Sequence, residues 1–157
     1  MTAPMLAIQA EAWLQEELGA QRALLQVLTR IEVAVRGADG AELERCGREL
    51  AGLVALGAAR EARRRALLGR LASELGLAAR ELNLTRICAA LVKRGIDAQR
   101  IQDARGELRA ATAATVKLSR RLCALAQYHR GLLEELCQLF LADAPAEAGG
   151  HLIDARG

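Results

Sequence analysis

The stretch Leu118–Phe140, LSRRLCALAQYHRGLLEELCQLF, decides the fold of this 157-residue chain. Leucine recurs in it at alternating steps of three and four residues, which places the side chains on one face of an α-helix. This pattern predicts one long helix that begins near residue 97 or 98 and ends near residue 143. Its seam positions are Ala111, Thr115, Leu118, Leu122, Leu125, His129, Leu132, Leu136 and Leu139, and Leu133 and Phe140 widen the seam at its end.

Two further helical patterns precede this one. The first predicts a helix from about Leu6 to Arg36, with a broad apolar face. Residues 37–40, Gly-Ala-Asp-Gly, interrupt it, and a second pattern predicts a helix from Ala41 to about Leu75. Because so few residues join the two helices, we expect them to fold back as an antiparallel hairpin.

The expected helix ends carry recognisable signals. Asp39 is a good N-cap, and Glu42 follows three residues later as in a capping box. Gly76 is the expected stop of the second helix. Residues 77–97 should form a connector with one short helix, roughly 85–94, capped by Asn83 or Thr85 and ended by Gly95.

These expectations define the fold class. The chain is 52% hydrophobic but only 2% aromatic, and a core of alanine and leucine suits long helices packed side by side. We therefore predict an all-α protein, in which an antiparallel helical hairpin, a short connector helix and a long C-terminal helix form an elongated three-helix coiled-coil bundle. One domain should span 1–143.

Residues 144–157 are predicted to be a flexible tail, because Pro145, Gly149 and Gly150 oppose a continuing helix. The tail nevertheless holds two apolar residues, Leu152 and Ile153. They are candidate docking residues, and the alternative is a tail with no role.

Charge and hydropathy indicate which cellular compartment and which classes of partner to expect. The net charge is +3, from 22 basic and 19 acidic residues that are interspersed, so no nucleic-acid partner is expected. The run Arg60–Arg65 is either an anion-binding patch or, as we favour, a solvated helix surface with Glu–Arg pairs. No signal peptide and no membrane-spanning stretch is recognised, which predicts a cytoplasmic protein without membrane insertion.

No motif points to catalysis. The sequence has no phosphate-binding loop and no nucleophile beside a base, and therefore no catalytic residue, metal ligand or cofactor is expected. The four cysteines at 46, 88, 123 and 137 lack metal or redox spacing and are predicted to be small buried core residues. His129 is interpreted as a polar residue that fixes the register of the seam, with a pH-sensitive element as the alternative.

The order of the expected helices, and three stretches, resemble the FlgN-type flagellar type III export chaperones. The first stretch is the hairpin, LLQVL at 24–28 through Asp39 to LERCGREL at 43–50; the second is LCALAQYHRGLLE at 122–134; the third is the ending LIDARG at 152–157. The pattern covers nearly the whole chain. It departs from the family at Ala126 and His129, where the family commonly has asparagines, and at Ile153, where it often has a tyrosine.

The resemblance implies a function. Such chaperones bind the C-terminal helical segments of hook-filament junction proteins in the cytoplasm, prevent their premature assembly and deliver them to the export gate. The family binds its substrate mainly with the C-terminal helix. A leucine stripe on a long helix also suits an amphipathic partner helix on physical grounds. The expected partner-binding residues are Leu118, Leu122, Leu125, Leu132, Leu133, Leu136, Leu139 and Phe140.

Two other classes of protein remain open. One is a structural coiled-coil adaptor, dimeric through the last helix and without a role in export. The other is an arginine-rich nucleic-acid binder that uses residues 60–70. Because the last helix is expected to be longer than the hairpin helices, part of its leucine stripe should find no cover within the chain.

Overall fold

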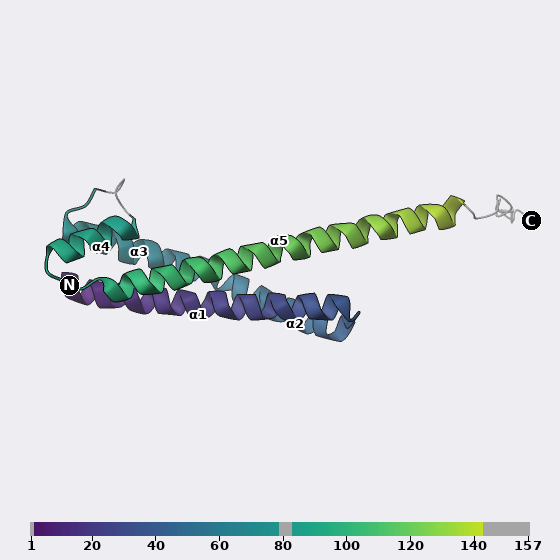
Figure 1. Cartoon of the computed structure of the whole chain (residues 1–157), viewed down its shortest axis with the longest axis horizontal. Coiled ribbons are helices and arrows are strands. Elements are labelled where there is room, and N and C mark those ends of the chain that lie inside the picture. The colour runs from purple at the N-terminus through teal and green to yellow at the C-terminus, as the bar shows by residue number, and fades with distance from the viewer. Residues whose placement is uncertain (1, 79–82, 143–157) are drawn as a thin grey trace, which may run out of the picture. The chain divides into compact units, whose positions relative to one another are not determined.

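The computed structural model describes residues 2–78 and 83–142, and the side chains of residues 140–142 are not described. The described residues form five helices and no strand, which confirms the all-α prediction (Figure 1). The helices are α1 (Ala3–Arg36), α2 (Gly40–Ala55), α3 (Gly57–Leu75), α4 (Leu84–Lys93) and α5 (Gln99–Ala142). None of these helices is long and apolar enough to cross a membrane.

The chain divides into two units, residues 1–120 and residues 121–157. The first unit holds α1 to α4 and the beginning of α5, and the described part of the second unit is the C-terminal half of α5. The predicted tail, with Leu152 and Ile153, lies outside the described residues, and the single-domain boundary at residue 143 stays a prediction.

α1 begins at Ala3, three residues before the predicted start. Pro4 lies in its first turn, where a missing backbone N–H is harmless because no intrahelical acceptor exists there. The early start matters for the core. Of the extra residues, Ala3 is buried beside Leu6 and Ala7, whereas Met5 is exposed, so the extra turn adds one small side chain to the apolar face.

The turn between α1 and α2 confirms one half of the expected capping box. The carboxylate of Asp39 accepts a hydrogen bond from the backbone N–H of Glu42 at 3.0 Å. The reciprocal bond was a wrong prediction, because the N–H of Asp39 donates to the carbonyl of Ala34. The side chain of Glu42 instead accepts from the guanidinium of Arg30 at 2.8 Å, which ties α2 to α1.

The expected second helix is two helices, α2 and α3, separated by Leu56. The prediction of one helix from 41 to 75 was therefore wrong at a single residue. Leu56 has φ −76° and ψ −12°, a tighter turn than a regular α-helix, and its side chain is exposed. Gly52 and Gly57 flank the break, and glycine weakens a helix through its backbone freedom.

The remaining helix ends agree closely with the sequence. α3 ends at Gly76, whose φ of 71° lies in the left-handed region, and the N–H of Leu77 donates to the carbonyl of Ala72 in a Schellman motif. The side chain of Asn83 caps α4 by accepting from the N–H of Arg86 at 2.9 Å. Gly95, with φ 74°, follows its end.

The hydrophobic core lies in the first unit, where α1, α3, α4 and the beginning of α5 meet. Small side chains such as Ala10 and Ala104 are buried between larger ones, so the helices can approach closely. The largest core side chains that are almost fully buried are Leu6, Leu14, Leu18, Leu71, Ile87 and Leu91.

Candidate functional site

The C-terminal half of α5 exposes a row of leucines. The exposed fractions are 38% for Leu132, 63% for Leu133, 41% for Leu136 and 62% for Leu139. Leu122 and Leu125, earlier in the same row, are half-buried. We call these six residues the distal leucine face. With 3.6 residues per turn, steps of three and four place all six on one side of the helix.

The rest of this helical segment carries charged and polar side chains together with small ones such as Ala126 and Cys137. Arg130 and Glu134, four residues apart, form an ion pair at 2.8 Å on the helix surface. Tyr128 lies on the margin of the distal leucine face and is exposed, and its ring meets that of His129 edge-on with centroids 5.9 Å apart. The segment is therefore amphipathic, and its apolar side is open to a partner.

The predicted binding residues fall into three groups. The six residues of the distal leucine face are at least partly exposed. Leu118 belongs to the first unit and is only 8% exposed, so it packs in that unit and leaves little surface for a partner. The side chain of Phe140 lies outside the described residues. His129, which interrupts the leucines, is exposed at the centre of the row.

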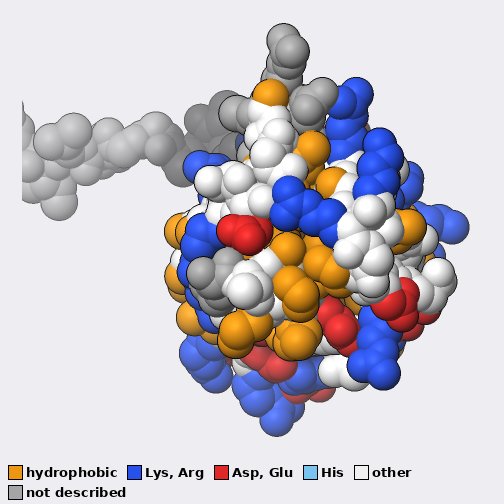
Figure 2. Space-filling model, turned by 90° about the vertical axis from the view of Figure 1, so that its left-hand side faces the viewer, with side chains coloured by type: hydrophobic (Ala, Val, Ile, Leu, Met, Phe, Trp, Pro, Cys, Tyr) orange, Lys and Arg blue, Asp and Glu red, His pale blue; other side chains and the backbone are white. Residues whose placement is uncertain are grey.

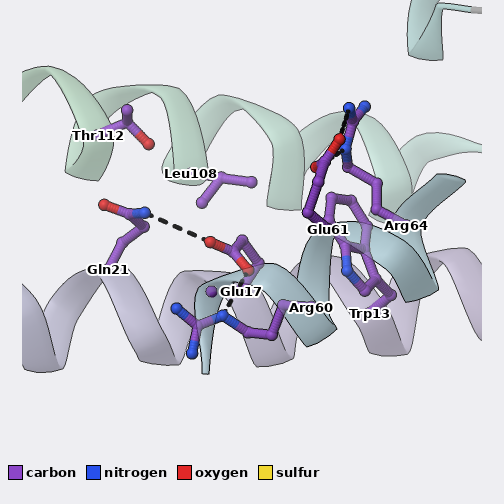
Figure 3. A pocket seen from close by; sticks show the side chains of 9 residues that line it. Trp13, Glu17, Gln21, Arg60, Glu61, Arg64, Leu108 and Thr112 are labelled. Carbon is purple, nitrogen blue, oxygen red and sulfur yellow. Dashed lines mark hydrogen bonds and ion pairs between the residues drawn. The ribbon is translucent and has the colours of Figure 1, made fainter. Parts of the chain in front are cut away.

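A cavity of about 200 Å³ in the first unit is the second candidate site (Figure 3). It lies between α1, α3 and α5, and its polar groups largely satisfy one another. Arg60 Nε lies 3.2 Å from the carboxylate of Glu17, and Arg64 donates two hydrogen bonds to Glu61 at 2.6 and 2.7 Å. The indole N–H of Trp13 is buried there without a hydrogen-bond partner.

These contacts agree with the interpretation of the arginine run as a solvated helix surface for Arg63 and Arg65, which are exposed, but not for Arg60, whose side chain is only 17% exposed. Each arginine between residues 60 and 65 pairs with a glutamate, either on α3 or on the neighbouring α1. Hydrogen bonds from Arg64 and then Arg65 stabilise the charged form of Glu61 and lower the pKa of its carboxyl from 4.5 to about 2. The two arginines that line the cavity, Arg60 and Arg64, are thus balanced by two glutamates, Glu17 and Glu61.

The cysteine prediction was correct for two residues and wrong for two. Cys46 and Cys88 are buried, and burial raises the pKa of both thiols, which keeps them protonated. Cys123 and Cys137 are exposed on α5. Within residues 2–78 and 83–142, no cluster of three or more histidine, cysteine or acidic side chains could hold a metal ion.

One apolar surface of the first unit was not expected from the sequence. Figure 2 shows apolar side chains gathered at the end formed by α4 and the beginning of α1, with lysine and arginine around them. A hollow on α3 and α4 contributes to this end and is lined by Leu75, Leu77, Arg86, Ala89, Ala90, Lys93 and Arg94. Because residues 79–82 between these helices are not described, we assign no site to the hollow.

Comparison with known protein families, with curated proteins and with solved structures finds no match for this chain. Function must therefore be argued from the site itself, and the distal leucine face is the strongest feature among the described residues.

Proposed function

We propose that this chain is a cytoplasmic export chaperone of the flagellar type III pathway, which binds the C-terminal helical segments of hook-filament junction proteins. On this proposal it prevents their premature assembly and delivers them to the export gate. The single observation that supports the proposal best is the exposure of Leu132, Leu133, Leu136 and Leu139 along one helix.

An exposed apolar row on an otherwise charged helix favours a binding role. Single exposed leucines are common, but a contiguous apolar patch with a polar rim marks an interaction surface. The spacing of three and four residues suits another amphipathic helix, whose side chains interlock with such a row. A helical segment of a client protein fits this description, and the binding itself requires neither nucleotide nor metal.

The choice of client comes from the resemblance to the FlgN-type chaperones. In that family the C-terminal helix binds the substrate, and here the exposed leucines lie on the C-terminal helix. The alternative function is a structural coiled-coil adaptor without a role in export. The same exposed face favours it, because a leucine row can pair with a second copy of itself.

A paired measurement on charge variants tests the proposal. Leu136→Asp and Leu139→Asp introduce a carboxylate that a helix contact would desolvate, at an effective cost of several kcal/mol per ion. The free variants should stay folded because both side chains are exposed. We expect binding of the C-terminal segment of a junction protein, measured by titration calorimetry, to be lost.

The matched control is Gln127→Asp. Gln127 is exposed and lies on the opposite side of α5 from Leu136. The substitution therefore adds the same charge without touching the distal leucine face. This variant should bind the client normally. Normal binding by a folded Leu136→Asp variant would show that the distal leucine face is not the client site, and the adaptor function would then be favoured.

A further inference from the structure

We propose that a second copy of the chain docks on the distal leucine face, with the two α5 segments antiparallel. The proposal rests on the side-chain pattern of residues 121–139 and stands independently of the proposed chaperone function. If that function also holds, the second copy competes with the client for the same leucines.

The antiparallel register follows from the spacing of the row. Leu122 lies opposite the partner's Leu139, Leu125 opposite the partner's Leu136, and His129 opposite the partner's Leu132. Two-fold symmetry repeats these three contacts in reverse, as an isologous interface requires. Every seam position from 122 to 139 is thereby covered, and each leucine side chain inserts among side chains of the other helix.

The flanks of this pairing are complementary as well. On one flank the small Ala126 lies beside the partner's Leu133, so a large side chain meets a small one. On the other flank Tyr128 lies beside the partner's Glu135, whose carboxylate can accept a hydrogen bond from the phenol.

A parallel pairing lacks this complementarity. In register, it would place the two His129 rings against each other at the centre of the interface. It would also put Tyr128 beside the partner's Leu133, where the phenol would meet no carboxylate. The antiparallel arrangement instead separates the two histidines and gives each one a leucine neighbour.

Shifting the antiparallel pairing by one heptad is also unfavourable. If Leu136 faced the partner's Leu132, Glu135 would lie beside the partner's Glu135, and like charges at this flank repel. The same shift would leave Leu122 and Leu125 without leucine partners. The opposite shift would bring Arg121 beside the partner's Glu135 but would set Leu136 against the partner's Leu118, which is buried in the first unit. The pattern therefore favours the register that pairs every seam position from 122 to 139.

Sedimentation equilibrium of the full chain without any client tests the pairing. We expect the mass to rise with concentration toward twice the chain mass of 16.8 kDa. Leu136→Asp should remain at the mass of one chain, and Gln127→Asp should associate like the unmodified protein. If Leu136→Asp fails to fold, Leu136→Ala serves in its place, with an expected loss of affinity of at least tenfold.

A chain that stays monomeric at every accessible concentration would overturn the pairing while leaving the client site untouched. Client titration of the same sample then reports on the proposed function alone. The two proposals can therefore fail separately, and the dimer is decided before any client is added.

Site-specific cross-linking tests the orientation. Cys123 and Cys137 are first replaced by serine, and one batch of chain carries Leu125→Cys while a second carries Leu136→Cys. The antiparallel register predicts a disulfide in the mixture of the two batches and little in either batch alone. Cross-linking of the Leu125→Cys batch with itself would instead show a parallel pair and overturn the register.

Discussion

Comparing Leu118→Ala with Leu133→Ala, two truncations in the same helical row, distinguishes the part of α5 that stabilises the fold from the part proposed to bind a partner. Leu118 is 8% exposed and Leu133 is 63% exposed, although both follow the same apolar pattern. Leu118→Ala should cost about 2–5 kcal/mol, because it removes buried methyl groups and leaves a cavity. Full burial of a leucine side chain contributes about 1.5–3 kcal/mol. Because only about a third of the Leu133 side chain is buried, Leu133→Ala should cost under about 1 kcal/mol.

Thermal unfolding followed by circular dichroism measures the difference. At roughly 2–4 °C per kcal/mol for a domain of this size, Leu118→Ala should lower Tm by about 4–20 °C and Leu133→Ala by at most about 4 °C. The protein must be dilute, because association would add a concentration-dependent stabilisation. Client binding should show the reverse order, with the larger loss for Leu133→Ala. Equal shifts in Tm would refute the division of α5 at Arg121.

Two further predictions concern charge and thiols. The pKa of Glu61 falls from 4.5 to about 2 on folding, so its ion pairs stabilise the protein above pH 4.5 and lose their effect as the pH drops toward 2. Glu61→Gln should therefore lower Tm at neutral pH and leave it unchanged at pH 2, and an unchanged Tm at both pH values would contradict the contacts. A maleimide reagent should label Cys123 and Cys137 in the folded protein at neutral pH, whereas the two buried thiols should react only after denaturation; rapid labelling of all four would contradict the burial.

The helices were predictable because their signals are local. Steps of three and four residues, the Asp39 cap and Gly76 each act within one or two turns, and the structure has a helix or a helix end at each of them. The break at Leu56 was missed because it spans a single residue and the helical pattern resumes on both sides. The early start of α1 was missed because Ala3 and Ala7 carry too little apolar surface to extend a leucine pattern.

The burial of individual side chains was less predictable, because it depends on which element covers a helix face. Leu118 and Leu132 occupy equivalent positions in the pattern, yet only Leu118 is buried. Cys123 and Cys137 did carry a usable signal: each follows the first residue of a three-residue step, and this position points to the side of the helix away from the seam. A pattern identifies the apolar face of a helix, and tertiary contacts decide how much of that face is covered.

The two units also differ in what stabilises them. Arg63–Glu16 is an exposed interhelical pair and contributes little, whereas Arg60–Glu17, with side chains only 17% and 18% exposed, is largely buried between α3 and α1. The core of the first unit is built mostly from alanine and leucine. In residues 121–139, Arg130 and Glu134 form an ion pair within the helix itself. Tertiary packing of an amphipathic face supplies most of the stability of a protein helix. On either proposal, the occupant of the distal leucine face should therefore also stabilise the helix that binds it, and the helicity of this segment should rise with its occupancy.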